Sequence, residues 1–246
     1  MRPLVLCYHA VSDGWPHLLA VPPAALEEQL EALLRRGYRA VRAQEVLAGR
    51  GRLLHVTFDD AFASVGNALP LLERLAVPAT VFACPAFAGD GRPLDLPELA
   101  DEVASRPHEL ATMNWDDLRA LAGEGVEVGA HSVSHRHLCE LADEELAREL
   151  RDSRRRIEDE LGRPCLLLAY PYGEHDDRVR AAARAAGFEA AFGLQPRDCS
   201  WSDAFRLPRV GIWRGEGSAV VAFKTSPLGR SRPVTALRRA RDRLAQ

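Results

Sequence analysis

The fold is decided by the stretch Leu53-Leu54-His55-Val56-Thr57-Phe58-Asp59-Asp60. It is apolar for most of its length and ends in two adjacent carboxylates. Such a run is typical of a parallel strand buried on both faces, because that strand has no solvent-facing side that needs polar residues. The two acids then mark the point at which the strand leaves the core.

Similar apolar runs recur along the chain and alternate with helical patterns. The other strand candidates are Leu4–Tyr8, Ala79–Cys84, Val126–Ala130, Leu166–Tyr170 and Ala190–Leu194. The predicted helices, each followed by glycine, are Pro23–Arg36, Asp143–Leu161 and Asp177–Ala186. We expect Asp143 to be the N-cap of the second helix. Strand–helix alternation over the whole length predicts an α/β fold whose parallel sheet is closed or nearly closed into a barrel.

No linker rich in serine or glycine divides the chain, so we predict a single domain over residues 1–224. From Lys224 onward there are seven basic residues and one acid. Residues 225–246 are therefore predicted to form a basic C-terminal tail with a short helix. Such a tail suits weak contact with an anionic membrane surface or a partner protein, although a solvated face accounts for it as well.

The composition excludes several classes of function. The formal net charge of −3 argues against nucleic acid as a partner. The longest apolar stretch, residues 77–89, is interrupted by two prolines and is too short to cross a bilayer, so we expect no transmembrane segment. The five cysteines form no Cys-x-x-Cys pair and are expected to be reduced thiols. With no recognisable signal peptide, we expect a cytoplasmic location; a secreted protein trimmed of its leader would look the same.

Polar side chains follow the predicted strands at the points where the strands end. His9 follows the first strand, Asp59 and Asp60 end the decisive stretch, and His131 and His135 follow a later strand. Because the carboxyl ends of parallel strands share one rim of a barrel, we expect these side chains to lie close together. Two imidazoles four residues apart and one carboxylate make a three-ligand zinc set that leaves a position open for water; cobalt, nickel and iron suit it too.

Adjacent carboxylates also suit hydrolysis. One can bind the cation, while the other stays unligated and accepts a proton from a metal-bound water whose pKa the metal lowers to roughly 7. Attack on an amide carbon needs, in addition, an oxyanion stabiliser and an acid for the leaving amine. This pattern leaves open which of Asp59 and Asp60 has which role.

The motifs resemble those of the polysaccharide deacetylase family, also called the nodulation-protein-B-like or carbohydrate esterase family 4 group. The matching segments are Thr57-Phe58-Asp59-Asp60, His131-Ser132-Val133-Ser134-His135 and Tyr170-Pro171-Tyr172-Gly173. The resemblance covers roughly residues 3–215 and implies a distorted, incomplete parallel (β/α) barrel of about seven units. It implies metal-dependent removal of the acetyl group from an N-acetylated amino sugar, in a glycan or a glycan precursor, by attack of a metal-bound water.

The resemblance also implies a role for each matching residue. Asp59 is expected to be the catalytic base. The backbone N–H of Tyr172, which follows Pro171, is expected to help polarise the acetyl carbonyl. One divalent ion, most suitably zinc, is expected to be held by Asp60, His131 and His135.

The chain departs from the family pattern in two places. The family usually has an arginine two residues before the motif proline, where this chain has Ala169; we predict that Arg209 replaces it, with Arg206 as its rival. The late histidine that supplies the family's general acid is absent, since no histidine follows His175. In relatives with a circularly permuted motif order, which include poly-N-acetylglucosamine deacetylases, this histidine comes from an early strand, and His9 matches that arrangement.

Other residues carry weaker expectations. His55 is expected to be a core histidine with its partners satisfied, and Trp115 is expected to pack at the start of a helix. Trp201 and Trp213 lie in irregular late segments, where an exposed ring would suit the apolar face of a pyranose.

Two other functions remain open from the sequence. The missing arginine at Ala169 admits a hydrolase of the same fold that acts on another carbon–nitrogen bond, such as a cyclic imide or a formamide. A catalytically silent carbohydrate-binding protein is the second, and the intact set of two acids and two histidines argues against it. The sequence names neither the sugar nor the metal.

Overall fold

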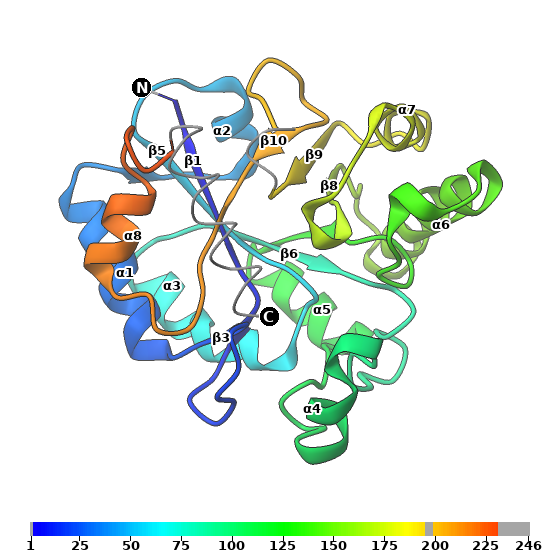
Figure 1. The fold of residues 1–246 in the computed structure, drawn as a ribbon, viewed down its shortest axis with the longest axis horizontal. Coiled ribbons are helices and arrows are strands. Elements are labelled where there is room, and N and C mark those ends of the chain that lie inside the picture. The colour runs from blue at the N-terminus through cyan, green and yellow to red at the C-terminus, as the bar shows by residue number, and fades with distance from the viewer. Residues whose placement is uncertain (1, 195–198, 231–246) are drawn as a thin grey trace.

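The computed structural model describes residues 2–194 and 199–230, and they form a parallel sheet surrounded by helices (Figure 1). In spatial order the main sheet consists of β10 (Leu207–Pro208), β9 (Ala190–Gly193), β8 (Leu167–Ala169), β7 (Glu127–Ala130), β6 (Ala79–Ala83), β5 (Leu53–Phe58), β1 (Leu4–Tyr8) and β11 (Val210–Gly211), with β4 (Arg39–Ala40) also paired to β5. All six predicted strands are present, and their ends differ from the prediction by at most one residue. The apolar runs are therefore parallel strands, as expected from their burial on both faces.

Residues 207–211 nearly close the sheet into a barrel. Strand β10 pairs with β9 at one edge of the sheet, and β11 pairs with β1 at the other edge. Arg209 joins the two strands, and its backbone N–H donates to the carbonyl of Gly193 at 3.2 Å. Because one short segment reaches both edges, the predicted distorted, incomplete parallel (β/α) barrel is confirmed.

Helices cover the outside of the sheet, as expected for crossover connections between parallel strands. They are α1 (Pro23–Arg35), α2 (Ala43–Ala48), α3 (Leu69–Arg74), α4 (Ala100–Ser105), α5 (Trp115–Gly123), α6 (Asp143–Leu161), α7 (Asp177–Ala185) and α8 (Ser218–Lys224). The three predicted helices are confirmed, with ends that differ by at most one residue. The prediction that Trp115 begins a helix is also confirmed, and Asn114 caps that helix with a capping box.

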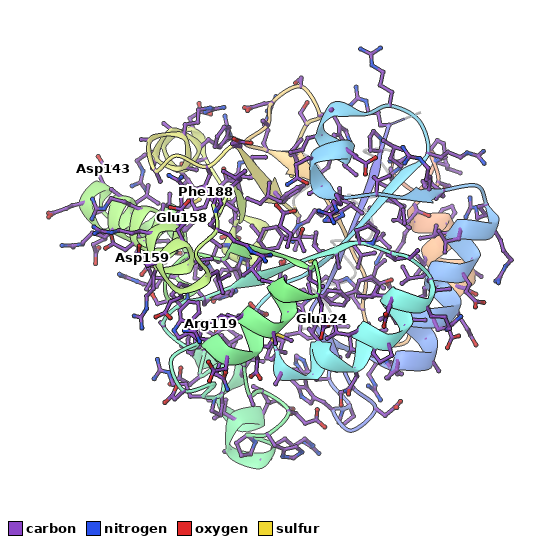
Figure 2. The ribbon with its side chains drawn as sticks, turned by 180° about the vertical axis from the view of Figure 1, so that it is seen from behind. Arg119, Glu124, Asp143, Glu158, Asp159 and Phe188 are labelled. Atoms are coloured by element: carbon purple, nitrogen blue, oxygen red, sulfur yellow. The ribbon has the colours of Figure 1, made fainter. Side chains whose placement is uncertain are left out.

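The predicted N-cap of α6 is wrong. Ala142 occupies the cap position, and Asp143 is the first helical residue. Its carboxylate points outward and lies 2.9 Å from Arg178, so it acts on the positive end of the helix dipole without capping it. Figure 2 shows Asp143 and Asp159 near opposite ends of α6 on the outside of the molecule.

Two hydrophobic cores support the barrel. The outer core lies between the sheet and the helices, and the inner core fills the barrel with residues such as Val5, Phe82 and Phe192. The Phe82 and Phe192 ring centroids lie 5.9 Å apart. Gly129 makes room for this pair, because a Cβ at that position would lie 2.5 Å from the Phe82 ring. The barrel is thus packed with apolar side chains below the rim at the carboxyl ends of the strands.

The rim is completed by short elements. Strands β2 (Ala10–Val11) and β3 (Ala20–Val21) form a separate pair, and four 3₁₀ helices are η1 (Ala63–Ala68), η2 (Pro97–Leu99), η3 (Leu138–Glu140) and η4 (Pro171–Gly173). Among the residues that the structure describes, no helix is both long enough and apolar enough to pass through a bilayer. The helix predicted for the C-terminal tail falls on residues 231–246, outside the described residues, and the domain boundary at residue 224 stays a prediction.

Candidate active site

The carboxyl ends of β5 and β7 bring one carboxylate and two imidazoles together. Asp60 Oδ1 lies 3.5 Å from Nε2 of His131 and 3.3 Å from Nε2 of His135. One potential ligand atom of each residue lies within 4.8 Å of the other two, and all three side chains are buried. The three residues that the sequence proposes as metal ligands therefore converge on one point.

The surroundings of this trio fit a cation. Asp60 Oδ1 is buried and has no hydrogen-bond partner among the described residues. Burial raises the pKa of Asp60, and it lowers the pKa of His131 and that of His135, the latter to about 4. An unpartnered carboxylate oxygen facing two imidazoles that stay neutral is the donor set that a divalent transition-metal ion requires.

Backbone and side-chain contacts orient the two histidines. Nδ1 of His131 hydrogen-bonds the carbonyl of Ala169 at 2.7 Å, which leaves its Nε2 with a lone pair facing Asp60. The backbone N–H of His135 donates to the hydroxyl of Ser132 at 3.0 Å. Ala169 thus contributes to the site through its backbone, although it lacks the arginine side chain that the family pattern leads one to expect there.

Glu149 anchors the loop that carries both histidines, and sequence reasoning missed it. Its carboxylate accepts the backbone N–H groups of Val133 and Ser134 at 2.8 and 3.0 Å and the Ser134 hydroxyl at 2.6 Å. Glu149 is 9% exposed and belongs to the buried stripe of α6. The sequence signal that could have identified Glu149 is its position beside Leu146 and Leu150 on the apolar face of an amphipathic helix.

Backbone strain is concentrated around the site. In the described residues, the non-glycine residues with positive φ are Asp60 (68°), Ala61 (49°), Ala76 (50°), Ser132 (59°), His135 (60°) and Tyr172 (58°). All of them except Ala76 lie in the three motifs or directly beside one. Left-handed backbone is unfavourable for residues with a Cβ, and such positions typically cluster at functional sites, where the surrounding structure holds them in place.

Asp59 lies next to the trio and is held by Arg209. Arg209 Nη1 and Nη2 donate to Oδ1 and Oδ2 of Asp59 at 2.5 and 2.8 Å, and Nη1 also donates to Thr57 Oγ1 at 3.1 Å. Burial alone would raise the pKa of Asp59, but the guanidinium and the neighbouring imidazoles hold it well below its usual range. Asp59 is therefore ionised, with Oδ2 at 3.9 Å from Nε2 of His131.

The structure separates the two candidate arginines. Arg209 is 4% exposed and fills the seam between β10 and β11, where it faces the barrel interior. Arg206 lies outside the site with its Nε 3.9 Å from Asp203 Oδ2. Arg209 thus occupies the place next to Asp59 that an arginine at position 169 was expected to fill.

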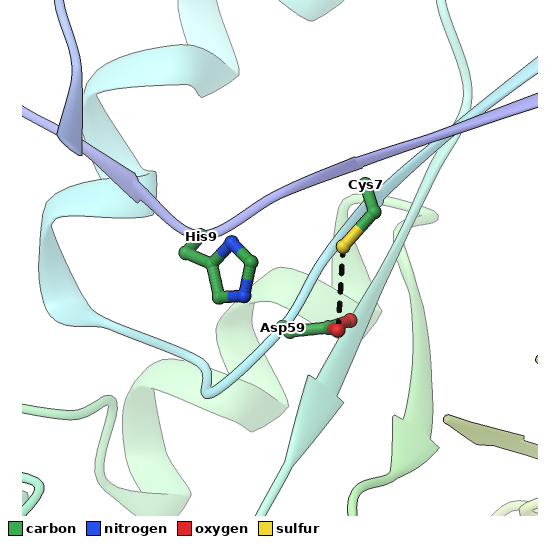
Figure 3. A group of neighbouring side chains, drawn as sticks. All are labelled: Cys7, His9 and Asp59. Atoms are coloured by element: carbon green, nitrogen blue, oxygen red, sulfur yellow. Dashed lines mark hydrogen bonds between the residues drawn. The ribbon is translucent and has the colours of Figure 1, made fainter. Parts of the chain in front are cut away.

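His9 borders the same carboxylate from the end of β1. Its ring stacks on Trp213 with centroids 5.4 Å apart and an interplanar angle of 24°. Burial lowers the pKa of His9, and within residues 2–194 and 199–230 no hydrogen bond reaches its Nδ1. Figure 3 shows the imidazole turned toward Asp59, with the thiol of Cys7 donating to Oδ2 of Asp59 at 3.3 Å.

Tyr172 forms a wall of the site. It lies in the 3₁₀ turn that begins at the buried Pro171, and its ring stacks on His137 at 3.7 Å and meets His135 edge-on at 4.7 Å. Its hydroxyl donates to Glu98 Oε1 at 2.7 Å. Glu98, on η2 in the long connection between β6 and β7, was not singled out in the sequence.

Of the remaining histidine and tryptophan candidates, some lie in the core and one lies at the site. His55 is a buried core histidine, as predicted, with Nδ1 bonded to the Val41 carbonyl and Nε2 to Thr80, each at 2.9 Å. Trp115 is 7% exposed and packs in the outer core, which confirms that prediction. Trp201 packs against the inner core, so of the two predicted sugar platforms only Trp213 lies at the site.

The chain is similar to known proteins over more than half of its length. The family model described as polysaccharide deacetylase matches residues 48–191. Chitin deacetylase 1 of the fungus Cryptococcus neoformans var. grubii is 35% identical over 127 residues, which are 52% of this chain and 25% of that protein. The match therefore spans about a quarter of the length of this relative.

Solved structures agree on the fold. The deacetylase PplD of Streptococcus pyogenes, in complex with acetate, superposes with a TM-score of 0.74 at 18% identity and covers 92% of this chain and 99% of its own. IcaB of Ammonifex degensii superposes with a TM-score of 0.68 at 22% identity and covers 96% of each chain. The family match covers more than half of the sequence, and this chain therefore belongs to the polysaccharide deacetylase family.

Proposed function

We propose that this protein is a metal-dependent hydrolase that removes the acetyl group from an N-acetylated amino sugar and releases acetate. The observation that carries the proposal is the convergence of Asp60, His131 and His135 beside a second, ionised carboxylate, Asp59. Membership of the polysaccharide deacetylase family supports the substrate class.

We infer that one divalent ion, zinc foremost, binds to Asp60, His131 and His135. When bound, it would supply a Lewis acid for the acetyl carbonyl and would lower the pKa of a coordinated water. The protein prepares for it by keeping both imidazoles neutral and by leaving a carboxylate oxygen without a partner.

Asp59 is the proposed general base. Its role is to accept a proton from the water that attacks the acetyl carbon, and the charge of Arg209 lowers its pKa so that the carboxylate is ionised at neutral pH. Arg209 fixes the plane of the carboxylate through two parallel hydrogen bonds. The proposal of cyclic imides or formamides as substrates rested on the missing arginine at Ala169. Because Arg209 contacts Asp59 instead, that reason no longer applies.

His9, in its protonated form, is the proposed general acid. Breakage of the carbon–nitrogen bond leaves an amine that needs a proton, and His9 is the imidazole that faces Asp59 without belonging to the metal trio. Stacking on Trp213 holds the ring in place. Tyr172 is the proposed oxyanion contact through its backbone N–H, in the turn that Pro171 begins.

The experiment that tests the proposal combines metal analysis with a screen for acetate release. The protein is stripped with a chelator, reloaded separately with zinc, cobalt, nickel or iron, and given N-acetylglucosamine oligomers, small N-acetylated glycosides, cyclic imides and formamides. We expect acetate from at least one N-acetylated sugar and no turnover after stripping. Imide or formamide hydrolysis without acetate would replace the proposal, and sugar binding with no product under any ion would indicate a silent binding protein.

The substrate is proposed to be a small glycoside or a lipid- or nucleotide-linked sugar precursor, which follows from the predicted cytoplasmic location. That location stays a prediction, and cell fractionation checks it directly. Detection of the protein in the secreted fraction would contradict the location and favour a polymer as substrate.

A further inference from the structure

Cys7 is a buried thiol that the proposed reaction does not use. It lies on β1, is fully buried, and donates its S–H to Asp59 Oδ2 at 3.3 Å (Figure 3). Burial raises the pKa of this thiol, so it is protonated at neutral pH and acts as a donor. The lone pair of Asp59 that faces Cys7 thereby accepts a hydrogen bond from the thiol.

His9 completes a group of three donors around this point. One nitrogen of its ring, the Cys7 sulfur and one Asp59 oxygen all lie within 4.8 Å of one another. His9 is 8% exposed, its ring is turned toward Asp59, and its Nδ1 has no hydrogen-bond partner in the described part of the chain. A sulfur, an imidazole nitrogen and a carboxylate oxygen form a donor set that soft and borderline ions such as Cd²⁺ and Zn²⁺ accept and that Mg²⁺ does not.

We propose that Cys7, His9 and Asp59 form a second cation site, selective for thiophilic divalent ions and separate from the trio of Asp60, His131 and His135. Binding replaces the S–H proton of Cys7, which leaves to solvent, with a sulfur–metal bond. Loss of that proton also frees the Asp59 lone pair that accepted its hydrogen bond. One exchange therefore makes two ligand atoms available, the Cys7 sulfur and an Asp59 oxygen.

The charges around the site make it weaker than the first. Arg209 already donates to both oxygens of Asp59, and its positive charge opposes a second cation. Loss of the thiol proton adds one negative charge, which offsets part of this repulsion. An ion in the first site, whose His131 Nε2 is 3.9 Å from Asp59 Oδ2, would add further repulsion. The second site therefore fills only when the ion is in excess.

Occupation of this site removes the proposed base and the proposed acid together, so an excess of a thiophilic ion inhibits the enzyme. This consequence rests on the proposed function, whereas binding of the ion does not. The two can be tested apart, because a thiolate bound to Cd²⁺ produces a charge-transfer absorption in the ultraviolet, and the first site contains no sulfur.

The test is a titration of the metal-free protein with Cd²⁺, followed by ultraviolet difference absorption. We expect a thiolate band in the wild type that is lost in Cys7→Ala and in Cys7→Ser; the serine variant keeps a small polar side chain if alanine perturbs folding. The matched control is Cys84→Ala, because Cys84 is also buried at the rim but donates to the backbone carbonyl of His131 and, among the described residues, belongs to no group of three potential metal ligands. That variant keeps the band.

A second arm separates this proposal from the proposed function. His131→Ala removes a ligand of the first site, so it abolishes acetate release but keeps the Cd²⁺ band. In the active wild type, excess Zn²⁺ inhibits acetate release at concentrations where Mg²⁺ does not, and Cys7→Ser is inhibited less relative to its own uninhibited rate. Absence of a band in the wild type, or a band that survives in both Cys7 variants, overturns the proposal whatever the outcome for acetate.

Discussion

Replacing Arg209 by methionine tests the central contact of the site. Methionine has a similar length and no charge, so Arg209→Met leaves Asp59 as a buried carboxylate without its cation; Asp59 is 1% exposed. Removing one partner of a buried ion pair typically costs about 3–5 kcal/mol, because the remaining charge is neither hydrated nor paired. We expect a loss of this size in the free energy of unfolding.

The assay is urea unfolding in the presence of a chelator, because a cation bound beside Asp59 would compensate part of the lost charge. The control is Arg206→Met. Arg206 forms a partly exposed contact with Asp203 at 3.9 Å, and such pairs contribute roughly 0–1 kcal/mol. Both variants remove one positive charge. The difference between their free energies of unfolding therefore reports on where that charge lies.

The double variant Arg209→Met with Asp59→Asn sharpens the test. The asparagine is neutral, so the double variant regains most of the stability that Arg209→Met loses, and the two changes are strongly non-additive. Acetate release stays low in the double variant because the base is missing. The view of a desolvated ion pair would be refuted if Arg209→Met lowered the free energy of unfolding by less than about 1 kcal/mol. It would also be refuted if adding Asp59→Asn did not restore the lost stability.

The other predictions concern the metal site and the proton transfers. Asp60→Ala abolishes stoichiometric zinc binding measured by metal analysis; a full equivalent of bound zinc would rule Asp60 out as a ligand. Asp59→Asn keeps the metal but lowers kcat by about 10²-fold or more, as for loss of a general base, and unchanged turnover would exclude this role. His9→Ala retains the metal and lowers kcat, whereas a normal rate would assign the acid to another group. Glu149→Gln leaves the ligands intact but weakens zinc affinity by about 10–100-fold, and unchanged affinity in competition with a chelator would show that the loop needs no such anchor.

Agreement between prediction and structure was closest where the signal is local. The strand over Leu53–Phe58 was located to the residue, because a strand buried on both faces leaves a mostly apolar run. Local spacing also explains why Asp60, His131 and His135 were proposed as ligands, since all three lie within five residues of the end of such a strand. The N-cap of α6 was misplaced because Asp143 and Ala142 are adjacent and only the backbone conformation distinguishes a cap from a first helical residue.

The sequence by itself determined the parallel α/β architecture and the positions of two acids and two histidines beyond the ends of strands, because both follow from the order of residues along single segments. Only the tertiary structure decided which arginine reaches Asp59, because Arg209 lies 150 residues away from it and arrives there through closure of the barrel between β10 and β11. The same holds for Cys7, Glu149 and Trp213. Their roles depend on contacts between distant segments, and these contacts exist only once hydrophobic burial has packed the strands and helices together.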